Sequence, residues 1–179
     1  MKKVVVISST PRSGGNSETL AQQFAEGARA AGHEVTYINL RDLGLKFCIG
    51  CMVCQKTRSD CVLSDGMKGL YETVQQADVL AFATPVYYYS VSGQLKTFLD
   101  RLNPLYVREN SFRDVYLLAT AAEDEDFAVD GSVTAVQGWC DCFDGVSIKG
   151  VLRGVGVNEK GEVEATDYPR RAYEMGGSV

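Results

Sequence analysis

Short runs of consecutive apolar residues alternate along the chain with longer segments in which apolar residues recur every three or four positions. The first run, residues 3–8, is rich in β-branched side chains, which is typical of a strand buried on both faces. The next segment places Leu20, Phe24 and Ala28 on one face of a predicted helix that ends at Gly32. The pattern predicts strands at 3–8, 35–40, 79–84, 115–121 and within 146–157. It predicts helices at 17–31, 65–76, 93–102, 129–143 and 169–175.

This alternation predicts an α/β protein with a doubly wound, five-stranded parallel sheet and helices on both faces. The 179 residues suit one domain, 1–179, with a cysteine-rich connection at 46–64. Five strands suit the order 2-1-3-4-5, and sheets of this kind bind ligands outside the carboxyl ends of their strands. We therefore expect binding chemistry after the first, third and fourth strands.

Composition and charge narrow the possible partners. The net charge of -5 disfavours a nucleic-acid partner, because phosphate backbones bind to positive surfaces. No apolar run approaches the ~18 residues of a membrane span, and polar residues from Ser8 onward interrupt the first apolar run too early for a signal peptide. We expect a cytoplasmic protein whose six cysteines serve as thiols, metal ligands or redox groups rather than disulfides.

The loop after the first strand reads Ser-Thr-Pro-Arg-Ser-Gly-Gly-Asn-Ser over residues 9–17. Its glycines let backbone N–H groups turn inward, and the start of the following helix favours an anion. Hydroxyl groups and the Arg12 guanidinium add further donors. A phosphate site is one interpretation and a capped glycine–serine turn is the other, and the position after the first strand favours phosphate.

The loop after the third strand contains three consecutive tyrosines, Tyr87, Tyr88 and Tyr89. Three neighbouring side chains cannot all face one core, whether in a strand or in a helix. At the carboxyl end of a strand they can instead line a cleft in which a flat aromatic ring stacks. A tyrosine-rich surface loop or a dimer contact is the alternative, and both roles can hold together.

These two loops resemble those of the NAD(P)H-dependent FMN reductases, a group of flavodoxin-like proteins. The family's first loop reads G-S-P-R-x-x-G-N-[ST], and here Ser9 and Thr10 replace its glycine and serine. Its second motif, P-[VI]-Y-x-x-x-x-[ST]-[GA]-x-[LM]-K followed by F-[LIM]-D-R, is met by residues 85–96 and 98–101. The resemblance implies an FMN site with its phosphate end at Ser9, Thr10, Arg12, Asn16 and Ser17. It implies that the flavin ring contacts Pro85, Val86, Tyr87, Tyr88, Tyr89 and Ser90, flanked by Thr120, Ala121 and Ala122.

The connection after the second strand carries four cysteines within fourteen residues, Cys48, Cys51, Cys54 and Cys61. Four thiolates in this space can surround one tetrahedral metal or a cubane cluster. The spacing C-x2-C-x2-C-x6-C resembles the compact motif of the iron–sulfur flavoproteins, which implies a [4Fe-4S] cluster as metal site. Zinc and free thiols are the alternatives.

No acid–base or nucleophilic residue is expected to be catalytic, because FMN supplies the redox chemistry and the chain has a single histidine. The first hypothesis is an FMN-dependent enzyme that takes hydride from NAD(P)H onto flavin N5 and passes electrons to a small acceptor. The second is an iron–sulfur flavoprotein that carries electrons and is fed by ferredoxin, and the third is a binding or regulatory module with a vestigial site. The resemblance also implies a homodimer or a higher homo-oligomer, whose partner is a small-molecule acceptor or a redox protein.

Overall fold

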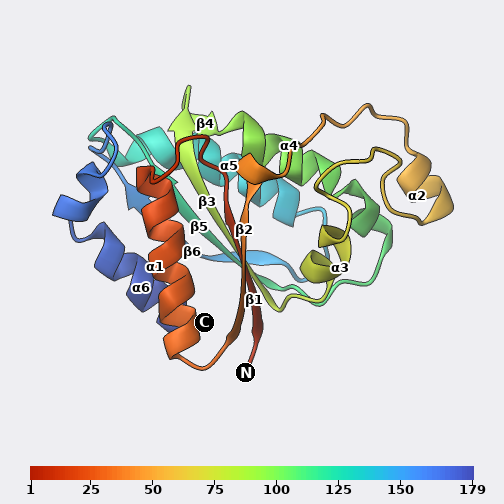
Figure 1. Ribbon diagram of the computed structural model, residues 1–179, viewed down its shortest axis with the longest axis horizontal. Coiled ribbons are helices and arrows are strands. Elements are labelled where there is room, and N and C mark those ends of the chain that lie inside the picture. Colours follow the sequence, from red (N-terminus) through yellow and green to blue (C-terminus); the bar gives the residue numbers. More distant parts are fainter.

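The computed structural model describes residues 1–179, which form one sheet covered by helices on both faces (Figure 1). Its five parallel strands run in the order β2-β1-β3-β5-β6, and a short strand, β4, adds an antiparallel hairpin to β3. The predicted order 2-1-3-4-5 is therefore confirmed once this hairpin strand is set aside. The strands are β1 (Lys3–Ser8), β2 (Glu34–Asn39), β3 (Val79–Tyr87), β4 (Ser90–Val91), β5 (Asp114–Thr120) and β6 (Ser147–Gly154).

Alternate residues of each central strand belong to two separate cores. In β1, Val4 and Val6 pack with α1 (Asn16–Ala30) and α6 (Tyr168–Gly177) on one face. Val5 and Ile7 pack on the other face, which is covered by α3 (Leu70–Gln75), α4 (Gly93–Arg101) and α5 (Asp130–Cys140). Burial on both faces explains why the central strands read as continuous apolar runs. No helix combines the length and hydropathy that a bilayer crossing requires.

The predicted helix at 129–143 ends early, at Cys140. Two other predicted boundaries are wrong for a local reason. The third strand does not end at residue 84, because Val86 and Tyr87 pair with Val91 and Ser90 and extend β3 into a hairpin. The predicted helix at 65–76 begins only at Leu70. Gly69 precedes it with a φ of 91°, a left-handed conformation that interrupts a helix.

The carboxyl ends of the parallel strands share one edge of the sheet, which lies uppermost in Figure 1. The β3–β4 hairpin projects beyond this edge, and α2 (Val53–Thr57) lies far to one side, in the cysteine-rich connection. The topology thus gathers the first loop, the tyrosine hairpin and the segments after β5 and β6 at the same end of the molecule.

Candidate functional site

A cleft of about 150 Å³ opens at the carboxyl edge between the loop after β1, the end of β3 and the segments at the ends of β5 and β6. Nine of the residues predicted to bind the cofactor line it: Thr10, Arg12, Asn16, Ser17, Pro85, Val86, Tyr87, Thr120 and Ala122. Ser9, Tyr88, Tyr89, Ser90 and Ala121 do not line it. The sequence interpretation missed Gly15, Val157 and Asn158, which complete the lining.

The end of the cleft formed by the first loop has the chemistry of an anion site. Helix α1 begins at Asn16 without a side-chain cap, so its first backbone N–H groups have no partner inside the helix. Ser17 is only 1% exposed, and its Oγ is buried without a hydrogen-bond partner. A buried hydroxyl without a partner is costly, and this one lines the cleft, where it is available to a group that enters. A Cβ on Gly15 would lie 2.9 Å from Thr10 Oγ1, so glycine keeps the backbone open here.

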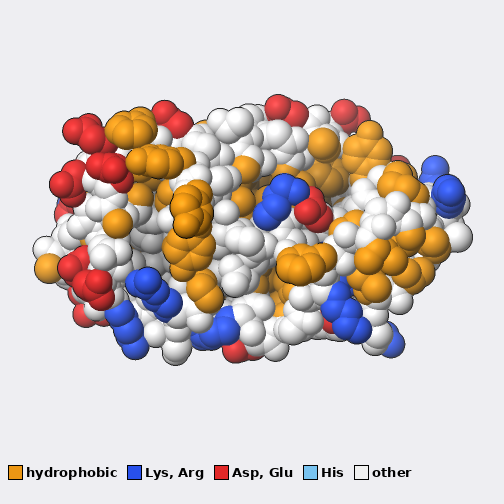
Figure 2. Space-filling model, turned by 90° about the horizontal axis from the view of Figure 1, so that it is seen from above, with side chains coloured by type: hydrophobic (Ala, Val, Ile, Leu, Met, Phe, Trp, Pro, Cys, Tyr) orange, Lys and Arg blue, Asp and Glu red, His pale blue; other side chains and the backbone are white.

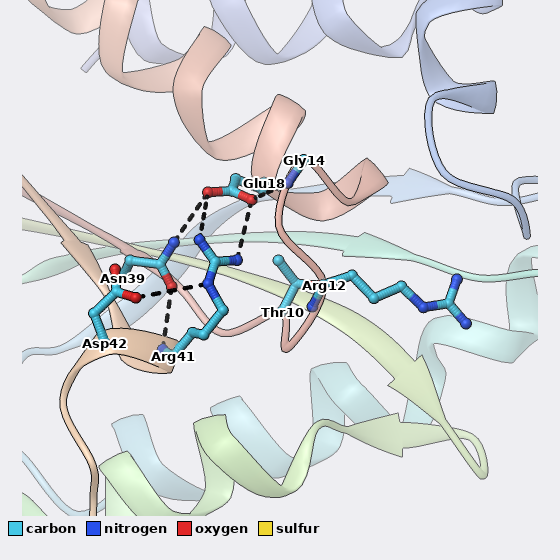
Figure 3. A network of polar contacts seen from close by, with 7 residues as sticks. All are labelled: Thr10, Arg12, Gly14, Glu18, Asn39, Arg41 and Asp42. Carbon is cyan, nitrogen blue, oxygen red and sulfur yellow. Dashed lines mark hydrogen bonds and ion pairs between the residues drawn. The ribbon is translucent and has the colours of Figure 1, made fainter.

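A carboxylate behind the loop fixes its shape (Figure 3). Gly14 N donates to Glu18 Oε2 at 2.6 Å. Arg41 Nη1 donates to Glu18 Oε2 and Arg41 Nη2 donates to Glu18 Oε1, each at 3.3 Å. Asn39 Nδ2 donates to Glu18 Oε1 at 3.0 Å. The charge of Glu18 is thus offset by Arg41. Arg12 extends in the opposite direction in Figure 3, where Nη1 donates to Asn158 O at 3.1 Å.

Three buried hydroxyls tie the first loop to the end of β3 and the start of α4. Ser92 Oγ donates to Ser9 Oγ at 3.0 Å, and Ser92 N donates to Thr84 Oγ1 at 3.0 Å. Ser9 Oγ in turn donates to Ala83 O at 2.9 Å. These bonds explain why Ser9 is buried outside the cleft lining: its hydroxyl holds two loops at a fixed separation.

The three tyrosines of the β3–β4 hairpin, here called the tyrosine hairpin, lie in three different environments. Tyr88 and Tyr89 occupy the turn with φ values of 49° and 58°, which are strained for residues with a Cβ. Tyr87 lines the cleft, and Tyr88 is fully exposed. The ring of Tyr89 stacks on Phe127, with centroids 5.9 Å apart and an interplanar angle of 14°. Only the first of the three rings therefore faces the cleft.

The four clustered cysteines line a second, smaller pocket together with Arg101 and Asn103. Cys54 is buried, and its Sγ accepts a hydrogen bond from Asn103 Nδ2 at 3.4 Å. Burial raises the pKa of the Cys54 thiol, although the hydrogen bond from Asn103 acts in the opposite direction. No three of the thiols lie close enough to hold a metal ion in this conformation. The donors thus share one pocket but are not arranged as a coordination sphere.

A buried ion pair closes the base of the loop that carries these cysteines. Arg101 and Asp65 are both almost fully buried, and Arg101 Nη2 donates to Asp65 Oδ1 at 3.0 Å. Arg101 Nη1 also donates to Lys46 O at 2.7 Å, and Lys46 N donates to Asp65 Oδ2 at 2.9 Å. The two ends of the loop are therefore joined directly to each other and to α4.

Hydrogen bonding keeps Asp65 ionised despite its position. Burial by itself would raise the pKa of the carboxyl, but hydrogen bonds from Arg101 and from the backbone N–H groups of Lys46 and Met67 outweigh it. The pKa of Asp65 consequently lies below its ordinary value. The fifth cysteine, Cys140, behaves differently: burial in the core raises its pKa to about 12, so it remains a neutral thiol.

The family and the fold emerge from comparison with known proteins. The family model of NADPH-dependent FMN reductases matches residues 2–151. An iron-sulfur flavoprotein of Methanocaldococcus jannaschii is 35% identical over 105 residues, which cover 59% of this chain and 54% of that protein. Another, from Archaeoglobus fulgidus, is 33% identical over 102 residues, 57% of this chain and 46% of that protein. The chain thus spans about half the length of these curated relatives.

Solved structures share the fold over nearly the whole chain. An NAD(P)H:quinone oxidoreductase from Methanothermobacter marburgensis has a TM-score of 0.76 at 19% identity, covering 99% of this chain and 95% of that one. An FMN-dependent NADH-azoreductase from Bacillus anthracis, solved in complex with FMN, has a TM-score of 0.70 at 15% identity, covering 99% of both chains. At these identities the structures establish the flavodoxin-like fold alone.

We expect Asp65→Asn to lower the free energy of unfolding by about 3 kcal/mol, because it leaves the buried Arg101 guanidinium without its counter-charge. Asp100→Asn removes an exposed partner of Lys96 and serves as the control, with an expected loss of about 0.5 kcal/mol or less. Denaturant unfolding at pH 7 measures both changes.

The same pair gives an expectation for acid pH. Since folding lowers the pKa of Asp65, its stabilisation is fully present above the unfolded value of about 3.9 and is lost as the pH falls through the lower folded value. The stability difference between the parent chain and Asp65→Asn should therefore shrink below about pH 4. A difference that is unchanged between neutral and strongly acid pH would contradict this account.

The matched residues make up most of the chain, and they contain the first loop, the tyrosine hairpin and the segment after β5, three of the four segments that line the cleft. The chain belongs to the NADPH-dependent FMN reductase family of oxidoreductases.

Proposed function

We propose that the chain binds FMN in the cleft at the carboxyl edge and uses it to pass electrons from NAD(P)H to a small-molecule acceptor. The observation that carries this proposal is the junction of two surfaces in one cleft. An uncapped helix N-terminus with a buried, unpartnered Ser17 hydroxyl lies at one end, and the wall formed by Pro85, Val86 and Tyr87 lies at the other.

The size of the cleft indicates how such a ligand would lie. Its 150 Å³ is less than the ~300–1,000 Å³ of typical ligand pockets. The enclosed part suits a phosphate and part of a sugar chain, so the ring would extend past Tyr87 onto the open edge. An open ring face is what a second, planar reactant needs for stacking.

Each segment has a separate task in this arrangement. The Ser17 hydroxyl and the first N–H groups of α1 would bind the phosphate, with Glu18 and Arg41 fixing the loop behind them. Pro85 to Tyr87 would support one side of the ring, and Thr120 and Ala122 would confine its edge. When bound, FMN supplies the hydride and electron transfer, and the chain needs no acid–base residue of its own.

We expect Ser17→Ala to weaken FMN binding about tenfold, because it removes a buried donor to a charged phosphate. Riboflavin, which lacks the phosphate, should lose little affinity. Ser111→Ala changes an exposed serine that precedes β5, away from the carboxyl ends of the strands, and is the matched control. Fluorescence titration measures all the affinities, and equal losses for FMN and riboflavin would place the phosphate elsewhere.

The shared cysteine pocket favours a second candidate, an iron–sulfur flavoprotein that carries electrons from ferredoxin. All four predicted ligands line that pocket, and the Asp65–Arg101 pair closes the loop at its base. Binding of a [4Fe-4S] cluster would require the exposed Cys48 and Cys51 to move towards Cys54 and Cys61. The similarity to named iron-sulfur flavoproteins supports this candidate.

We expect the chain purified without oxygen to retain iron and sulfide if this candidate is correct. Cys54→Ser should then lose most of the bound iron, because it removes the buried ligand, while Cys142→Ser should retain it, because Cys142 lies outside the run. Iron assay and the absorbance spectrum give the readout. If the chain holds no iron before or after reconstitution, and NADPH nevertheless bleaches the absorbance of its bound flavin, the iron–sulfur candidate is overturned and the reductase function stands.

We also propose that the chain forms a homo-oligomer through the loop that carries the cysteines. Figure 2 shows hydrophobic side chains gathered at the end of the molecule where α2 lies. The exposed apolar residues of this loop are Phe47, Ile49, Met52 and Val62. Apolar groups gathered on a surface are typical of protein contacts.

A charge placed in this surface should separate the copies. We expect Ile49→Asp to shift the molar mass, measured by light scattering, towards that of a single chain, because a buried unpaired charge is costly. Tyr173→Asp, on α6 at a distance from the loop, is the matched control. A parent chain that is monomeric at high concentration would contradict the proposal.

A further inference from the structure

The segment after β6 folds back over the first loop and is fastened to it. Asn16 Nδ2 donates to Glu159 O at 2.9 Å, and Gly161 N donates to Asn16 Oδ1 at 3.0 Å. Arg12 Nη1 donates to Asn158 O at 3.1 Å. Two residues of the first loop thus hold a segment more than 140 positions away, and that segment lies beyond residues 2–151, which match the family.

This segment carries a lysine onto the backbone of the first loop. A Cβ built on Gly14 would lie 2.8 Å from Lys160 Cε and 3.1 Å from Lys160 Nζ. Gly14 has a φ of 65° and no side chain, so the ammonium group can approach the loop where it turns towards α1. The lysine side chain therefore lies against the first loop, two residues before α1 begins and just outside the residues that line the cleft.

The acidic residues near Lys160 are engaged elsewhere. Glu162 Oε2 accepts hydrogen bonds from Asn158 N at 2.7 Å and from Glu159 N at 2.9 Å. Glu159 Oε1 accepts from Asn158 Nδ2 at 3.1 Å. Glu18, which accepts a hydrogen bond from Gly14 N, pairs with Arg41. No ion pair or hydrogen bond engages the Lys160 ammonium group, so its charge is free to act on a ligand.

We propose that Lys160, which lies against the first loop just outside the cleft lining, reaches over that loop and binds the phosphate of the cofactor. The inference rests on the proposed FMN function and adds a residue to its phosphate site. A phosphate monoester carries a charge of about -1.5 to -2 at pH 7. The dipole of α1 and the neutral donors of the first loop would offset part of this negative charge. The ammonium group of Lys160 would add a full positive charge.

The test compares the affinities of FMN and riboflavin for Lys160→Gln, Lys160→Arg and the parent chain. We expect Lys160→Gln to weaken FMN binding about threefold to tenfold, because the lysine is solvent-exposed and its attraction is partly screened. Riboflavin binding should remain unchanged, and Lys160→Arg should bind FMN nearly as well as the parent. The loss should diminish in about 1 M salt, where charges are screened within a few ångströms. Lys68→Gln, an exposed lysine near α3, is the matched control.

The ratio of the two affinities identifies which claim fails. If the parent prefers FMN to riboflavin and Lys160→Gln keeps the same ratio, the role of Lys160 is overturned while the FMN site stands. If the parent binds neither flavin, the proposed function fails and this inference fails with it. Equal weakening of both ligands by Lys160→Gln would also overturn the inference, because it would indicate a structural effect on the loop.

Discussion

The cleft of this chain depends on the parallel arrangement of its central strands, which brings the ends of β1, β3, β5 and β6 to one edge. Adjacent strand ends do not by themselves hold their loops in place. The buried hydroxyls of Ser9, Thr84 and Ser92 do this by linking the loop after β1 to the end of β3 and the start of α4. A cleft with one polar and one apolar wall is the consequence, and the distance between its walls is set by hydrogen bonds in the core.

Two features with an energetic cost lie at this edge of the sheet, one inside the cleft and one in the hairpin turn next to it. Ser17 presents a buried hydroxyl without a partner, and α1 starts without a cap. Tyr88 and Tyr89 hold left-handed backbone conformations in a turn that glycine or asparagine would occupy more easily. Unpaired polar groups and strained turns are often found at ligand sites. They persist only where the surrounding structure is stable enough to hold them in place. The proposed phosphate position accounts for the first cost.

The sequence predicted the features that local residue types determine. β-Branched runs identified the buried strands, and the glycine–serine loop before α1 identified the polar end of the cleft. Contacts between residues distant in the chain left no such signal. Nothing around Lys160 or Asn158 marks a binding segment, because their position depends on Asn16, more than 140 residues earlier. The Asp65–Arg101 pair is similar: its partners join α4 to both ends of the cysteine loop, and the helix predicted from residue 65 begins later, at Leu70. The three tyrosines were a correct sign of an unusual loop, but only the hairpin geometry showed that Tyr87 alone faces the cleft.

The most direct measurement of the central claim is a crystal structure of the chain grown with excess FMN. The account predicts phosphate density within hydrogen-bond distance of Ser17 Oγ and the first N–H groups of α1, with the ring against Pro85, Val86 and Tyr87. Flavin bound with its phosphate away from residues 10–17, or with its ring on a surface that Pro85 to Tyr87 do not reach, would contradict it.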